Sequence, residues 1–197
     1  MENLYRTPQA QLVDAPLAGA EGHFFTTSIR KMSILFIATM GLYILYWGYK
    51  QWDSQRSRML PKKIMPVWRS IFSIFYMHSL SGLIDEQLRQ QGKPLLGSGP
   101  ATLYVVVAIG SAVLGQVSSR IEELPVLLDV FLMLLQLCIL LPMISIQRQA
   151  NLASQDPQGS GNAQMSGANI GFIVAGVLFW CLYLGSIATL LILGVPA

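Results

Sequence analysis

The sequence predicts an all-α integral membrane protein with about four transmembrane helices plus one interfacial or half-inserted amphipathic helix. Of its 197 residues, 53% are hydrophobic and 12% are charged, and this charged share lies well below the roughly 25% that is usual in soluble domains. Apolar runs recur that reach the roughly 20 residues needed to cross a bilayer. The first run ends in aromatic residues followed by cations, a pattern typical of the point where a span meets the cytoplasm.

Residues 1–28 are predicted to form a polar, flexible tail, because prolines and glycines interrupt any helix there. The remaining residues, 29–197, are predicted to form a single transmembrane helical bundle. The first span is placed over residues 28–49, and a basic cytoplasmic loop over residues 50–65 follows it.

A second helix is predicted over residues 66–91, because Pro66 can start it and a Gly-Lys-Pro sequence follows its end. It is long enough to span, but its serine stripe and the polar residues Arg69 and His78 fit an in-plane or half-inserted helix at least as well. With this helix on the surface, most of the 13 Lys and Arg residues lie on the cytoplasmic side. That arrangement obeys the positive-inside rule better and places the N-terminus outside.

Three further spans follow along the chain. One is predicted over residues 101–118 and the next over residues 125–147, where Pro142 is expected to kink the helix. A polar loop over residues 148–168 separates these from the last span, over residues 169–195.

Small residues recur at helical spacing on three of the predicted spans, and such stripes let helix backbones approach closely within a bilayer. Gly115 belongs to a stripe on residues 101–118, and Gly171 belongs to one at the start of the last span. Gly41 and Gly48 share one face of the first span. We therefore expect function to depend on helix contacts more than on any ionisable group.

Two motifs carry a resemblance to a known family. The pattern GLYxxYWxYKxW runs from Gly41 to Trp52, and PxWRxIFxxF runs from Pro66 to Phe75. They resemble a family of small bacterial multi-pass inner-membrane proteins. A later stretch is also similar, through Pro142, Gln147, Arg148 and Asn151. The resemblance implies a location in the bacterial inner membrane and implies no reaction.

Three candidate residues lie in the second helix. Trp68 and Arg69 open it, and the Arg69 guanidinium is interpreted as an anchor to lipid phosphate, or alternatively as a binding site for an anionic ligand or headgroup. His78 is interpreted as a packing histidine that is held by hydrogen bonds. A proton-relay or metal role would require a nearby carboxylate or second ligand.

Two candidates lie in the span over residues 125–147. Asp129 is in its first turn, where a helix N-terminus stabilises a carboxylate, and an ion or proton site is the alternative. Gln136 lies near mid-membrane on the same face and is expected to form an interhelical hydrogen bond. The cysteines, Cys138 and Cys181, lie in apolar runs and are expected to be buried.

The sequence contains no motif of nucleophilic, metal or phosphate chemistry: GxSxG, HExxH and the P-loop are absent. No catalytic residue, cofactor or metal site is therefore expected, and a net charge of +3 gathered beside one span does not indicate nucleic-acid binding. Membrane lipids and another membrane protein, or a second copy of the chain, are the expected partners. The leading interpretation is a non-enzymatic protein that acts through contacts in the bilayer, for example an immunity protein against a membrane-active toxin. The alternative is a component of a small-solute or ion transporter or channel.

Overall fold

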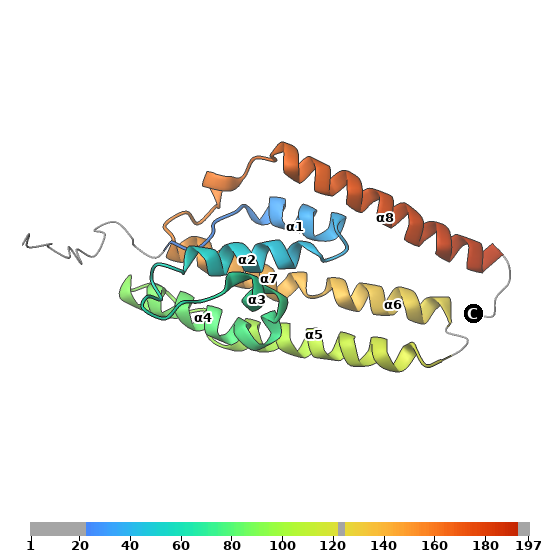
Figure 1. Cartoon of the computed structure of the whole chain (residues 1–197), viewed down its shortest axis with the longest axis horizontal. Helices are drawn as coiled ribbons and strands as arrows, with labels where there is room; N and C mark the ends of the chain where they lie inside the picture. Colours follow the sequence, from blue (N-terminus) through green and yellow to red (C-terminus); the bar gives the residue numbers. More distant parts are fainter. Residues whose placement is uncertain (1–22, 122–124, 193–197) are drawn as a thin grey trace, which may run out of the picture.

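The computed structural model of the protein describes residues 23–121 and 125–192, and this part of the chain is helical without β-strands (Figure 1). Its elements are α1 (Ile29–Ala38), α2 (Tyr43–Ser54), α3 (Pro66–Ile71), α4 (Ser73–Gln90), α5 (Gly99–Ser118), α6 (Val126–Leu137), α7 (Leu140–Ala153), a 3-10 turn (Ser160–Asn162) and α8 (Gly167–Ile192). The all-α prediction is confirmed. Three stretches are long and apolar enough to cross a membrane, Gly99–Ser118, Val126–Ala153 and Gly167–Ile192, so the predicted count of four is not confirmed.

The predicted first span consists of two short antiparallel helices. Helix α1 has 10 residues, which is about 15 Å at the α-helical rise and about half of a hydrocarbon core. The chain reverses at Met40 and Gly41, whose φ angles are 52° and 88°. The Gly41 amide donates to the Phe36 carbonyl at 2.8 Å, and the Thr39 hydroxyl accepts from the Tyr43 amide at 3.0 Å. Gly41 therefore permits the turn between α1 and α2, and it does not belong to a helix-contact stripe.

The helix predicted over residues 66–91 starts at Pro66 as expected, but it is broken at Phe72, which separates α3 from α4. α4 is not among the stretches that are apolar enough to cross. Helix α3 packs against α2 at Gly48, where an added Cβ would lie 2.9 Å from the Ser70 hydroxyl oxygen. The close approach explains why a small residue is needed at that position.

The remaining predicted spans agree with α5, with α6 plus α7, and with α8. The interruption between α6 and α7 lies at Cys138 and Ile139, one turn before Pro142, which lacks an N–H to donate back to the Cys138 carbonyl. That carbonyl instead accepts from the Leu141 amide at 3.0 Å. The polar loop that was predicted over residues 148–168 begins only after Ala153, because α7 continues to that residue.

An extended segment, residues 23–28, lies against α7 and the loop that follows it. The Phe24 amide donates to the Ser154 hydroxyl at 2.7 Å, and the Thr27 amide donates to the Asn151 side chain at 3.2 Å. Residues joined by hydrogen bonds lie at the same level of the molecule. These contacts do not fit the expectation that a full span separates the tail from the end of α7; residues 1–22 lie outside the described part.

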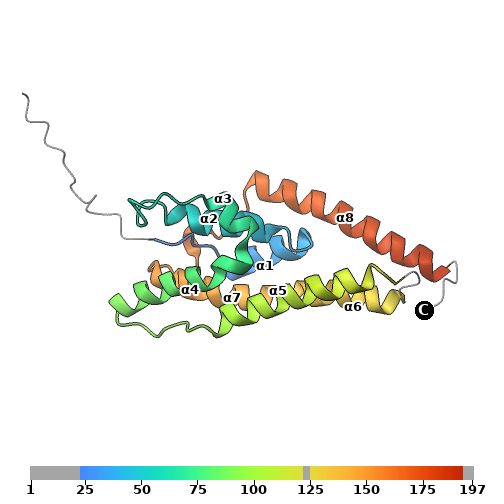
Figure 2. The same cartoon turned by 60° about the horizontal axis from the view of Figure 1, so that its bottom comes forward.

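The two ends of the molecule differ in charge. Helix α5 ends, α6 begins and α8 ends at one end, while α2, α4 and α7 end at the other (Figures 1 and 2). Arg120 follows the end of α5. The other described cations lie in the elements of the opposite half or at the start of α1: Arg30, Lys31, Lys50, Arg56, Arg58, Lys62, Lys63, Arg69, Arg89, Lys93 and Arg148. We call this half the basic half.

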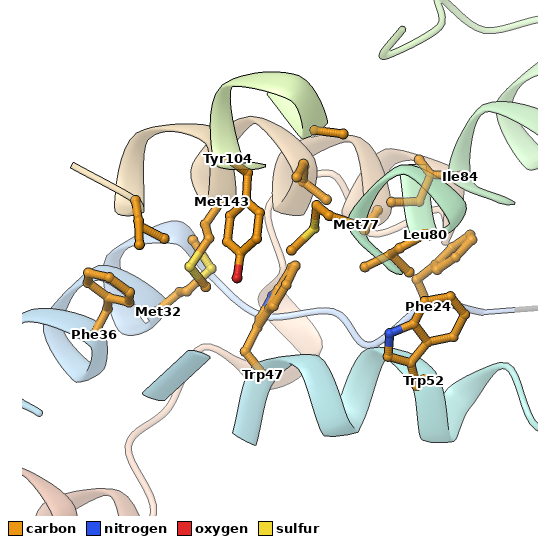
Figure 3. Packing of buried hydrophobic residues seen from close by; sticks show 14 of the residues in the cluster. Phe24, Met32, Phe36, Trp47, Trp52, Met77, Leu80, Ile84, Tyr104 and Met143 are labelled. Atoms are coloured by element: carbon orange, nitrogen blue, oxygen red, sulfur yellow. The ribbon is translucent and has the colours of Figure 1, made fainter. Parts of the chain in front are cut away.

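The buried core lies where α1, α2, α4, α5 and α7 meet (Figure 3). The Trp47 ring is fully buried, and Met32, Met143 and Tyr104 approach it from three other helices. By contrast, α8 buries little of its surface against the rest of the chain. The chain thus combines a well-packed basic half with apolar helices that project from it.

Candidate functional site

The most connected polar group in the described structure is a set of four fully buried side chains, which we call the polar clasp: Trp47, Gln51, Gln147 and Asn151. Trp47 and Gln51 are one turn apart on α2, and Gln147 and Asn151 are one turn apart on α7. Residues four apart share one helix face. The two pairs therefore face each other across the helix interface.

Gln147 is the centre of the clasp. Its Oε1 accepts from the Trp47 indole at 2.5 Å and from Gln51 Nε2 at 2.9 Å. Its Nε2 donates to Asn151 Oδ1 at 2.7 Å and to the Phe25 carbonyl at 3.0 Å. A buried amide that is satisfied on both its donor and acceptor sides fixes a unique arrangement of its neighbours.

The clasp holds the backbone of residues 23–28. Asn151 accepts from the Thr27 amide and donates to the Thr27 carbonyl, at 3.2 and 2.9 Å. Gln51 Nε2 donates to the Phe25 carbonyl at 3.0 Å. Buried backbone groups need hydrogen-bond partners, and here side chains supply the partners that another strand would supply in a sheet.

The loop before α8 closes over the same segment. Gly159 adopts φ 64°, and a Cβ there would lie 2.2 Å from the Thr27 carbonyl carbon. Asn162 Nδ2 donates to the Thr26 carbonyl at 3.2 Å. Lys31 Nζ donates to Asn162 Oδ1 at 2.6 Å, and burial lowers the pKa of this ammonium group. Because the clasp itself contains no ionisable group, it can position chain segments but cannot transfer protons.

Arg69 lies in an aromatic environment. Its guanidinium carbon is 4.4 Å from the centre of the Trp52 ring and 5.0 Å from that of Tyr76, within the range of cation–π attraction. Its Nη1 reaches the Met59 sulfur at 3.7 Å. The neighbouring Trp68 is half exposed and stacks on Phe72, with ring centres 5.9 Å apart.

His78 is exposed, and its Nε2 lies 3.2 Å from the Thr102 hydroxyl of α5. Among the described residues, no group of three or more His, Cys, Asp or Glu side chains could hold a metal ion. His78 therefore has a hydrogen-bond partner but not the surroundings that a metal or proton-relay role requires.

Asp129 connects two of the apolar helices, because its Oδ2 accepts from the Tyr183 hydroxyl of α8 at 3.1 Å. Gln136, two turns further on the same face of α6, is exposed and has no side-chain hydrogen bond within the described ranges. The structure does not bring the two together. Cys138 and Cys181 are exposed, contrary to expectation.

In the described part of the chain, the stripes predicted on residues 101–118 and at the start of the last span bring no glycine into close contact. A Cβ added at Gly115 or Gly171 would meet nothing within 4 Å. The glycine that does permit close packing on α8 is Gly176, where a Cβ would lie 1.9 Å from the Ala38 carbonyl oxygen. Outward-facing Gly115 and Gly171 remain available for contacts with another molecule.

An apolar cavity of about 360 Å³ lies between the start of α2 and the first half of α8. Leu42 and Tyr46 line it on one side, and Phe172 and Phe179 line it on the other. Ser166 lies at the end near the basic half. Helix α8 packs mainly on α1, and the cavity is the space that it leaves open toward α2.

Sequence reasoning missed the polar clasp as a unit. Gln147 and Asn151 appear only through the family resemblance, and Gln51 falls in a segment that was predicted to be a loop. The available signal is the repetition of amides four residues apart, Gln51 with Gln55 and Gln147 with Asn151. In an otherwise apolar helix this spacing indicates a buried polar face.

No protein-family model, curated protein or solved structure matches the chain. The resemblance to the bacterial membrane family therefore stays a prediction.

Proposed function

We propose that the protein is a non-enzymatic, multi-pass membrane protein that acts by binding another membrane protein, or a second copy of itself, within the bilayer. The three apolar stretches identified above, α5, α6 with α7, and α8, would cross the membrane. An immunity protein that blocks a membrane-active toxin is one form of this function. Such a role requires apolar surface and specific helix contacts but no catalytic group.

The observation that carries this proposal is the exposed amide of Gln136 in an apolar helix. An amide without a partner is costly in hydrocarbon, since no water is present to satisfy it. A polar side chain from a neighbouring helix would remove that cost. Interhelical hydrogen bonds of this kind contribute about 0.6–2 kcal/mol in membrane proteins.

The open glycines support the same conclusion. Gly171 lies on the exposed surface of α8, and Gly115 has no neighbour within 4 Å of an added Cβ. In a bilayer such positions permit the close backbone approach that stabilises helix pairs. A transporter is less well supported, because the sequence-predicted ionisable candidates, His78 and Asp129, each pair with a hydroxyl group of another helix.

The distribution of charge suggests the orientation. Because the basic half carries almost all described cations, the positive-inside rule favours placing that half in the cytoplasm. The proposed location is the bacterial inner membrane. In this arrangement the α1–α2 hairpin enters the membrane from the cytoplasmic side and returns to that side, without crossing.

Photo-crosslinking in native membranes tests the proposal. A photoreactive residue at Met133, one turn before Gln136, should give a light-dependent product that is heavier than the chain. Gln136→Leu should reduce this product several-fold, whereas Gln116→Leu, the same change near the end of α5, should leave it unchanged. Copies with two different tags distinguish self-association from binding to another protein. A yield that does not respond to Gln136→Leu would contradict the proposal.

A further inference from the structure

Two arginines near the start of α3 lack anionic partners. Nη1 of Arg58 is shielded from solvent and has no hydrogen-bond partner in the described chain. Arg69 binds only the Met59 sulfur through its N–H groups, and a thioether is a weak acceptor. Arg69 reaches Met59, the residue that directly follows Arg58, so both arginines belong to the region where the α2–α3 connection meets α3. Among the described residues, the salt bridges involve Arg56 and Arg89 instead.

The Arg69 guanidinium is oriented for binding an anion. Its central carbon lies over the Trp52 and Tyr76 rings, which are steeply inclined to each other, and these cation–π contacts hold the group without using its N–H donors. Guanidinium edges match the geometry of phosphate oxygens and bind them in a bidentate manner. A fixed orientation reduces the entropy that is lost when an anion binds.

Beside these arginines lies an exposed apolar surface, which we call the apolar elbow: Val67, Trp68, Ile71, Phe72 and Phe75. Phe75 is 76% exposed and Trp68 is 52% exposed. Exposed apolar patches with charged neighbours mark sites of membrane or protein interaction.

The elbow lies level with the beginning of α5. The Ser73 and Tyr104 hydroxyl groups are 2.6 Å apart, and His78 contacts Thr102. If α5 crosses the membrane, its first turns lie where headgroups meet hydrocarbon. The elbow would then enter the acyl region, while Arg58 and Arg69 would lie at the depth of the phosphates.

We propose that Arg58 and Arg69 bind the phosphate of an anionic phospholipid whose acyl chains lie on the apolar elbow. This inference rests on the membrane placement given under the proposed function, but it does not depend on the protein partner. Charge complementarity favours this occupant, because the adjacent exposed residues Lys62 and Lys63 add positive charge.

Native mass spectrometry of the purified full-length chain in detergent tests the inference. Phosphatidylglycerol should remain bound, and phosphatidylcholine should bind about tenfold more weakly. Arg58→Gln and Arg69→Gln should each weaken phosphatidylglycerol binding by about tenfold, the loss expected for a charge-assisted hydrogen bond. Arg89→Gln is the matched control, since it removes the same charge from a residue that is paired with Glu86.

The remaining outcomes are also decisive. If Arg69→Gln does not fold, Arg58→Gln and Arg69→Lys carry the test, because lysine keeps the charge but loses the planar fork. Equal binding of both lipids, or equal loss in Arg89→Gln, would overturn the inference. Full competition by millimolar inorganic phosphate would overturn the lipid assignment in favour of a free-phosphate site. Loss of lipid binding with intact crosslinking at Met133 would separate this inference from the proposed function.

Discussion

The side chain of Asn151 forms hydrogen bonds with both backbone groups of Thr27, accepting from its amide and donating to its carbonyl. Both residues are fully buried, and 124 positions separate them in the sequence. The pairing joins residues 23–28 to α7. It therefore fixes which helices surround the core, and its loss should destabilise the whole basic half.

Replacing Asn151 with leucine should destabilise the protein by about 2–5 kcal/mol, because two buried backbone groups would lose their partners at about 1–3 kcal/mol each. The unfolding midpoint in detergent should fall, and amide hydrogen exchange in residues 23–28 should become faster. Gln90→Leu serves as the control, since Gln90 is exposed at the end of α4. An unchanged exchange rate would mean that the loop before α8 holds the segment by itself.

Gly159→Ala should displace residues 23–28, because the new methyl group would lie 2.2 Å from the Thr27 carbonyl carbon. Gly97→Ala separates this clash from backbone strain: Gly97 has φ 71° but nothing within 4 Å of an added Cβ. We expect Gly97→Ala to cost about 1–2 kcal/mol, the penalty for a left-handed alanine, and Gly159→Ala to cost clearly more. Limited proteolysis near residue 23 should distinguish the two variants. Equal proteolysis rates in the two variants would show that small backbone shifts relieve the clash at Gly159.

Gly176→Ala should loosen the contact between α8 and α1, because the added Cβ would lie 1.9 Å from the Ala38 carbonyl oxygen. The expected cost is about 1–3 kcal/mol, as for other overpacked sites. The hydrogen bond from the Trp180 indole to the Ile37 carbonyl, 2.8 Å in the structure, should weaken and change the Trp180 fluorescence. Gly171→Ala has room for its methyl group and should leave both stability and fluorescence unchanged.

Acid should loosen the loop before α8 through Asp156. Partial burial raises the pKa of this carboxyl, but hydrogen bonds from the Gly161 and Ser160 amides and the Ser160 hydroxyl outweigh it and hold the pKa below its usual range. A depressed folded-state pKa stabilises the fold above the unfolded-state pKa of about 3.9, and that stabilisation is lost as the pH falls below it. The stability difference between the native chain and Asp156→Asn should therefore shrink between about pH 5 and pH 3, as measured by thermal unfolding. A constant difference over this range would contradict the role of the charge.

Cysteine labelling should find His23 and Ser57 on the same side of the membrane and Ser119 on the other. The basis is the hydrogen bonding of residues 23–28 to α7 and the position of the α2–α3 loop at the same end (Figure 1). The experiment places single cysteines at these positions in a chain with Cys138 and Cys181 changed to serine. Intact cells are then treated with an impermeant thiol reagent. Only Ser119→Cys should react. Labelling of His23→Cys without labelling of Ser57→Cys would contradict this placement and would indicate that the first predicted span does cross the membrane.

Sequence reasoning predicted those features that depend on local composition. The apolar length of α5 and α8 is visible in the sequence, and Pro66 and Pro142 mark a helix start and a helix interruption for local steric reasons. The same reasoning failed at Met40 and Gly41, because apolar residues continue on both sides of the turn. An apolar run has the same appearance whether it crosses a membrane or folds back on itself.

The candidate sites depended on contacts that are distant in the sequence. The aromatic rings around Arg69 come from α2 and α4, so the local sequence suggested a contact with lipid phosphate but not the rings that hold the guanidinium. Gln147 appears in the sequence as one polar residue at the end of an apolar span. Its partners Phe25 and Trp47 are 122 and 100 positions away, and no spacing rule connects them.

The turning back of the α1–α2 hairpin has a consequence for how the chain enters a membrane during synthesis. On the proposed placement, the first helix to cross is α5, which begins at Gly99. The described chain before α5 stays on the cytoplasmic side, so Trp47, Gln51 and the cationic loop never have to be translocated. Helices α5 and α6 can then enter together as a hairpin, and the short connection that contains Arg120 is all that this step must carry across. The polar clasp is completed only when α7 emerges, which makes insertion of this hairpin a precondition for folding of the basic half.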